Sequence, residues 1–227
     1  MTRGILIAGN ESSLFRAAVS EAGKRVESFG CVTIPNRISL SEKTGVPPLK
    51  PESTEGAIPL LWNPASSISA RTLLIAAENR LQKINDAILV CSPPAVFKTA
   101  ETLMPEEIEI LVNDHIKGWF FLARELVLYF RRSGEGSLSF IVPKAVPGGT
   151  KNTQVDILGP SAASSFRSFA QGILDSSGNE AFHVMGFTGY EAGTESEFAA
   201  WFFKIIDEGT AKNSGRWHQY SKLRLFK

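Results

Sequence analysis

Short apolar runs and amphipathic stretches alternate along this chain, and this alternation restricts its fold more than any other feature. The apolar runs have the length and composition of buried strands. The stretches between them place apolar residues at helical spacing, as in Leu14, Ala18 and Ala22. Strands joined by helices pair in parallel, with helices on both faces of the sheet. We therefore predict an α/β chain with a doubly wound, Rossmann-type parallel sheet.

The expected elements can be given by their residues. The strands are Gly4–Ala8, Cys31–Ile34, Pro59–Leu61, Asn85–Val90, Ser137–Val142, Ala181–Phe187 and Trp217–Tyr220. The helices run from near Ser12 to Gly30, and over Ser66–Lys83, Ile108–Arg132, Pro160–Leu174 and Glu195–Glu208. Residues 36–59 carry prolines among polar residues and predict an irregular loop. Residues 209–227 predict a short strand and a basic tail, which we expect to pack on a partner subunit rather than bind nucleic acid.

Composition predicts one domain over residues 1–227. The chain is 43% hydrophobic and 21% charged, as in ordinary globular proteins. Its formal net charge is +1, so no strong positive electrostatic field favours binding to nucleic acid or anionic lipid. No apolar run is long enough to span a membrane, and the first residues enter a strand without a signal-peptide pattern, which favours the cytoplasm. Cys31 and Cys91 predict buried free thiols, and the histidines have no metal-ligand spacing.

The segment from Asp86 to Leu174 carries a family resemblance. An apolar strand is followed by Leu111-Val112-Asn113 in a long helix, then by a second strand and by a helix that opens with Ser161-Ala162-Ala163-Ser164-Ser165. This order and spacing resemble the short-chain dehydrogenase/reductase family, whose catalysis uses a strand-end Ser, a Tyr and a Lys four residues later. The resemblance places the Tyr at Ser161 and the Lys at Ser165. The family's helix Asn matches Asn113, but Val142-Pro143 offers no hydroxyl.

The resemblance also implies a site for NAD(P), whose pyrophosphate would lie at the turn after the first strand. On the family's Gly-xxx-Gly-x-Gly pattern this turn has Gly9, Ser13 and Phe15, with Asn10 inside it. Phe15 belongs to the helix core or projects into the cofactor cleft, and either position alters the turn.

Other positions implied to contact the cofactor follow three further strands. They are Asn36 and Arg37, Asn63, and Cys91 and Ser92, where Pro93 and Pro94 replace a loop that usually lies along the cofactor. Arg37 would favour NADP by pairing with a 2′-phosphate, unless it is a solvated loop arginine.

The missing Tyr and Lys remove the family's proton transfer, since Ser161 is a much weaker acid than Tyr and Ser165 has no charge. Lys144 and Tyr190 are possible substitutes, and so is His115, although each has an ordinary structural explanation. We therefore expect a catalytically degenerate relative that acts as a binding or scaffold protein, with NAD(P) binding weak or lost. The alternatives are an active NAD(P)-dependent oxidoreductase on a small carbonyl or alcohol, and a cleft that binds a nucleotide or metabolite without redox chemistry.

Assembly is the last expectation. The helix over Ile108–Arg132 is apolar on more than one side, and Pro160–Leu174 adds Phe166, Phe169 and Ile173. In the resembled family these two helices pair with their copies across a two-fold axis. We predict a homodimer or homotetramer through them, against the alternative that loops of the same chain cover the extra aromatics.

Overall fold

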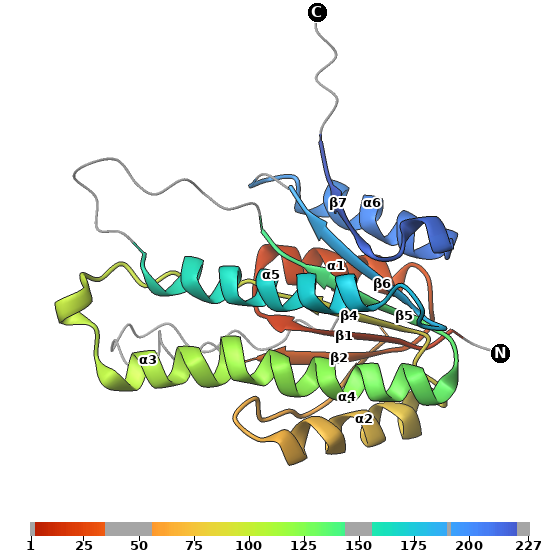
Figure 1. Ribbon diagram of the computed structural model, residues 1–227, viewed down its shortest axis with the longest axis horizontal. Helices are drawn as coiled ribbons and strands as arrows, with labels where there is room; N and C mark the ends of the chain where they lie inside the picture. The colour runs from red at the N-terminus through yellow and green to blue at the C-terminus, as the bar shows by residue number, and fades with distance from the viewer. Residues whose placement is uncertain (1–2, 35–55, 144–155, 190–191, 222–227) are drawn as a thin grey trace, which may run out of the picture.

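The computed structural model describes residues 3–34, 56–143, 156–189 and 192–221. Within these residues, seven parallel strands form one sheet in the order β3-β2-β1-β4-β5-β6-β7 (Figure 1). The strands are β1 Ile5–Asn10, β2 Phe29–Ile34, β3 Ala57–Pro59, β4 Asp86–Val90, β5 Ser137–Ile141, β6 His183–Thr188 and β7 Arg216–Gln219. The strand order reverses between β1 and β4, which confirms the predicted Rossmann-type arrangement.

Helices cover both faces of this sheet (Figure 1). One face packs against α1 Ser13–Gly23 and α6 Glu195–Glu208. The other packs against α2 Ser67–Leu81, α4 Gly118–Ser133 and α5 Leu158–Ser176. Alternate residues of β1 face the two layers: Leu6 and Ala8 lie in one core, Ile5 and Ile7 in the other. A strand buried on both faces must be apolar throughout, as the run Ile5–Ala8 is.

Several predicted boundaries were wrong, and two of them have a clear cause. The first helix ends at Gly23 rather than Gly30, and Gly30 instead lies inside β2, where a Cβ would come within 3.0 Å of Leu6 and Leu60. Phe29 and Gly30 therefore belong to a strand rather than to the helix, because they pair with β3. The third strand is Ala57–Pro59 rather than Pro59–Leu61, because Phe29 and Cys31 pair with Ala57 and Pro59. Of the predicted loop 36–59, residues 36–55 lie outside the described part.

The long helix predicted over Ile108–Arg132 consists of three segments. It begins as α3 Pro105–Val112, continues as a π-helical turn over Asn113–Lys117, and becomes α4. The amide of Gly118 donates to the carbonyl of Asn113, five residues back. A Cβ on Gly118 would stand 2.5 Å from the Pro64 side chain, so glycine lets the helix approach that segment closely. The predicted Glu195–Glu208 helix is confirmed at both ends.

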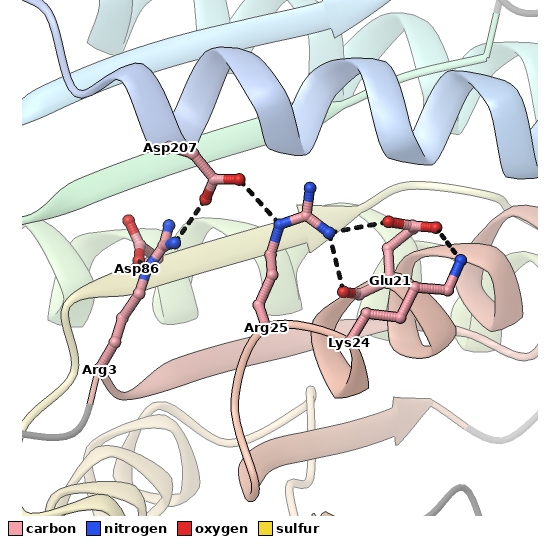
Figure 2. Close-up of polar contacts among 6 residues, drawn as sticks. All are labelled: Arg3, Glu21, Lys24, Arg25, Asp86 and Asp207. Atoms are coloured by element: carbon pink, nitrogen blue, oxygen red, sulfur yellow. Dashed lines mark hydrogen bonds and ion pairs between the residues drawn. The ribbon is translucent and has the colours of Figure 1, made fainter.

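An ion network closes the sheet at the amino ends of its strands (Figure 2). Arg3, just before β1, bonds to Asp86 of β4 at 2.5 Å and also to Asp207 of α6. Asp86 accepts a further bond, at 2.5 Å, from the hydroxyl of Ser137 in β5. Arg3 therefore ties the central strands to the end of α6. Burial opposes the charge of Arg3, but its bonds to the two aspartates outweigh burial and raise its pKa.

The network continues onto α1 through Arg25 (Figure 2). Its guanidinium lies 2.8 Å from Asp207 and 2.8 Å from Glu21, which also pairs with Lys24. Burial raises the pKa of Glu21 and of Asp207, but the hydrogen bonds from their cationic partners outweigh it, so both values fall below the usual 4.5 and 3.8. Both carboxylates are therefore charged at neutral pH and hold the ends of α1 and α6 together.

The network predicts a loss of stability in acid. A carboxyl with a depressed folded pKa stabilises the fold above its unfolded pKa and loses that contribution as pH falls through the folded value, so the loss should begin below about pH 5. We expect Asp207→Asn to lower the free energy of unfolding by about 1 kcal/mol at pH 7, because two partly exposed ion pairs are lost. The difference should shrink towards pH 3 in urea titrations. Glu27→Gln, at an exposed position, is the control, and equal effects of the two variants at pH 7 would contradict the prediction.

Candidate functional site

The carboxyl ends of β1 and β4 form the candidate site, because ligands of doubly wound sheets bind where the strand order reverses. The turn from β1 into α1 begins at Gly9. Phe15, in the first turn of α1, is only 3% exposed and packs in the core beneath that helix. A Cβ added to Gly9 would lie 2.5 Å from Cδ2 of Phe15. The phenyl ring therefore lies directly against the Gly9 backbone and fills the space between strand and helix.

The two serines of the turn form hydrogen bonds with α1 and α6. Ser12 is the N-cap of α1, and its hydroxyl accepts a hydrogen bond from the amide of Phe15 at 3.1 Å. Ser13 is exposed, and its hydroxyl donates to Glu195, at the start of α6, at 3.1 Å. One orphan amide at the N-terminus of α1 is thus satisfied by the chain itself, and a carboxylate stands beside it. Sequence reasoning missed Glu195, because a contact between residues 182 positions apart has no local signal.

Asn10 differs from its neighbours. It pairs with Ile34 of β2 along the backbone and is 3% exposed. Among the described residues, neither its side-chain nitrogen nor its side-chain oxygen has a hydrogen-bond partner. A buried amide without partners costs about 1–3 kcal/mol, and such groups in native proteins usually bind a water or a ligand. Asn10 is therefore the polar group at the end of β1 with unused hydrogen-bonding capacity.

The residues after β3 and β4 have structural contacts. Asn63 is exposed and its side-chain oxygen accepts from the amide of Ala65, which shapes the turn before α2. Cys91 is fully buried, which raises the pKa of its thiol, and its amide donates to the carbonyl of Ile141. Ser92 is half-buried beside Pro93. Cys31 is also free, and burial raises the pKa of its thiol to about 11, so both cysteines are poor nucleophiles at neutral pH.

The π-helical turn brings two buried polar residues to this end of the sheet. Asn113, the one match to the family's catalytic set, is half-buried, and its carbonyl accepts from Gly118. Asp114 and His115 follow it and are 0% and 1% exposed. His115 therefore lies inside the protein rather than on the surface of the helix.

Ser161 and Ser165 lie one turn apart on α5. Ser161 is exposed, and its hydroxyl donates to the carbonyl of Ile157 at 2.7 Å, whereas Ser165 is half-buried. Neither side chain carries a charge or exchanges a proton readily at neutral pH. The other predicted site residues, Asn36, Arg37, Lys144 and Tyr190, lie outside the described part of the chain.

Surface hollows lie elsewhere, between α2 and α4. One, of about 160 Å³, is lined partly by Arg71, Glu78, Glu125 and Arg132, and Glu78 pairs with Arg132 across it at 3.5 Å. It is lined by none of the predicted site residues. Within the described ranges, His, Cys, Asp and Glu side chains form no group that could hold a metal ion. No helix among them is both long enough and apolar enough to cross a membrane.

Comparison with known proteins identifies the fold. No family model matches the sequence, and no curated protein matches it significantly. Solved structures do match. A short-chain dehydrogenase from Bacillus anthracis has a TM-score of 0.73 at 13% identity, with 96% of this chain and 95% of that chain covered. One from Mycobacterium smegmatis has a TM-score of 0.72 at 10% identity, covering 98% and 94%. An NADH-dependent reductase, A1-R', complexed with NAD has a TM-score of 0.71 at 12% identity, covering 96% and 95%. The chain has the short-chain dehydrogenase/reductase fold over nearly its whole length.

The contact between Gly9 and Phe15 predicts how the turn responds to substitution. Gly9→Ala should lower the free energy of unfolding by about 1–3 kcal/mol, because the new methyl group overlaps the phenyl ring. The double variant Gly9→Ala/Phe15→Leu should lose less than the sum of its single variants, since the smaller side chain relieves that overlap. Gly178→Ala, where a Cβ meets no atom within 4 Å, is the control. Additive losses in denaturant titrations would show that the two positions do not touch.

Proposed function

We propose that this chain is a divergent short-chain dehydrogenase/reductase that has lost its oxidoreductase chemistry and acts as a binding or scaffold protein. The observation that carries the proposal is the Phe15 ring packed against Gly9, where the fold would otherwise expose backbone to a pyrophosphate. The Ser13–Glu195 contact supports it, because a carboxylate beside the turn repels a phosphate. NAD(P) does not fit this turn in the usual mode.

The catalytic positions support the same conclusion. A proton must pass between a protein group and the substrate oxygen in carbonyl reduction, and a positioned acid or base contributes about 10²–10⁴ in rate. At the family's Tyr position the exposed Ser161 hydroxyl donates to a backbone carbonyl. At the family's Lys position Ser165 supplies no cation to lower the pKa of a neighbour. The remaining family match, Asn113, cannot perform proton transfer alone.

An NAD(P)-dependent oxidoreductase on a small carbonyl or alcohol is the second candidate. It is favoured by the NAD complex of one structural neighbour and by the unpartnered Asn10 amide at the end of β1. In that case Lys144 or Tyr190 would have to replace the missing acid, and Arg37 would favour NADP.

Titration with NADH and NADPH tests the proposal directly. Dissociation constants weaker than about 1 mM are expected by calorimetry, a binding free energy of only about −4 kcal/mol. Phe15→Gly should bind more tightly than the wild type, because it removes the ring from the turn. Micromolar binding by the wild type would overturn the proposal. If such binding favours NADPH, Arg37→Ala should erase the preference.

Activity assays on a panel of carbonyls and alcohols at neutral pH give the matching test. We expect no turnover, and none from Ser161→Tyr/Ser165→Lys, because the strand-end hydroxyl and the glycine turn are also missing. Wild-type turnover that disappears in Tyr190→Phe or Lys144→Ala would establish the second candidate.

We also propose a homo-oligomer through α4 and α5. Phe120 is 42% exposed and stacks on Phe169 with ring centroids 4.0 Å apart, so an aromatic pair lies at the surface between these helices. Ser164, Ser168 and Gly172 are exposed at intervals of four along α5, and such small residues allow another helix to approach closely. The sheet and α2 cover part of the predicted surface, since Trp119, Leu126 and Phe130 are buried within the chain.

Phe169→Glu should therefore convert an oligomer of the wild type into monomers, because it places a charge in the centre of the contact. The mass should be measured by light scattering at micromolar concentration in 0.5 M salt, where contacts between exposed charges are screened. Ile68→Glu, on the exposed face of α2, is the control and should leave the mass unchanged. A monomeric wild type, or an intact oligomer in Phe169→Glu, would contradict the prediction.

A further inference from the structure

Helix α3 has an apolar stripe that the described chain leaves uncovered. Met104, Ile108 and Val112 recur every fourth residue along it and are 53%, 42% and 41% exposed. The opposite side of the helix is occupied, because Leu111 is buried in a small core with Leu158 and Ala162 of α5. α3 is therefore apolar on two sides, whereas a surface helix needs only one. A second apolar stripe on a helix of this kind is typical of an interaction surface.

The charges beside this stripe are all negative. Glu101, Glu106 and Glu109 are exposed, and none of them forms an ion pair with a residue in the described ranges. The sequence from Thr99 to Asp114 contains four glutamates, one aspartate and no lysine or arginine. Glu107 differs from them, because it pairs with Lys98 at 2.7 Å. We call Met104, Ile108, Val112, Glu101, Glu106 and Glu109 the acidic α3 surface.

The complementary pattern occurs near the carboxyl end of the same chain. Residues 209–227 contain five lysines and arginines and no acidic residue. Within them, 222–227 reads Lys-Leu-Arg-Leu-Phe-Lys, which alternates cationic and apolar side chains. These six residues lie outside the described part of the chain, but their chemistry follows from the sequence. A chain with a net charge of only +1 thus separates an acidic apolar surface from a basic apolar segment.

The positions of the two regions favour contact between copies. Tyr220 packs against Phe198 and Trp201, so the described chain leaves β7 on the face that α6 covers. α3 instead packs against α5, which covers the opposite face of the sheet. Pairing of α3 with its own copy is disfavoured, since it would bring like charges together. A basic occupant avoids this repulsion and covers the apolar stripe.

We propose that the acidic α3 surface of one copy binds the basic segment 222–227 of a second copy. The contact can be made twice in a closed pair, since each copy offers one surface and one segment. The leucines and phenylalanine of the segment cover the stripe formed by Met104, Ile108 and Val112. Its lysines and arginine pair with the three exposed glutamates, so attraction depends on salt.

Charge exchange between full-length variants tests this contact. Variant A carries Glu106→Lys and Glu109→Lys, and variant B carries Lys222→Glu and Arg224→Glu. Binding of one immobilised copy to another in solution should be at least about tenfold weaker for A with A and for B with B than for wild type with itself in 50 mM salt. The mixed pair of A with B should recover most of the wild-type affinity. Association through α4 and α5 is common to all pairs, so it does not affect the comparison.

Two controls make the result specific. Glu27→Lys/Glu208→Lys changes the net charge as variant A does, but at exposed positions outside the acidic α3 surface. This control should not bind B more tightly than B binds itself. The differences between pairs should also vanish in 0.5 M salt. If A binds B no more tightly than A binds A, the proposal is wrong. The acidic α3 surface and segment 222–227 could then meet only within one chain. If variant A and the control bind B equally tightly, the difference in affinity depends only on net charge, and the proposal is also wrong.

Discussion

The parallel sheet is buried on both faces, and this burial determines where polar side chains can lie. Because helices cover β1 on either side, every residue from Ile5 to Asn10 is buried, and the strand has no solvent-facing position. Polar chemistry is therefore confined to the two edges where strands begin and end. At the amino edge the chain satisfies its charges internally: Arg3, Arg25, Asp86 and Asp207 neutralise one another and join β1, β4, α1 and α6. The ion pairs at that edge therefore have a structural role.

The edge at the carboxyl ends of the strands differs from the amino edge in the contacts that hold it. There the chain fills the turn between β1 and α1 with its own side chains. Phe15 fills the space above Gly9, Ser12 caps α1 and Ser13 bonds to Glu195. Each contact ties the turn to the neighbouring core or helix. The exception is Asn10, whose buried side-chain amide forms no hydrogen bond with the residues that the structure describes.

The exposed surfaces of α3 and of the α4–α5 pair differ in the side chains that they carry. The α4–α5 surface is rich in aromatic and small residues, with Phe120 stacked on Phe169. The α3 segment carries exposed glutamates beside its apolar stripe. The π turn at Asn113 separates these two parts of what the sequence presents as one helix. Because it inserts one extra residue, it changes the direction in which the apolar positions on either side face.

The order of strands and helices could be predicted from the sequence, because hydrophobic periodicity is a local property. The sequence placed α6 at Glu195–Glu208 and gave the parallel, doubly wound class. It also determined that no tyrosine or lysine stands at positions 161 and 165. Three outcomes could be read only from the folded chain: Phe15 lies in the core, Ser13 contacts Glu195, and His115 is buried. The tertiary structure also ended α1 at Gly23, because pairing with β1 and β3 draws Phe29 into a strand. These outcomes depend on contacts between residues far apart in the chain, and no local pattern encodes them.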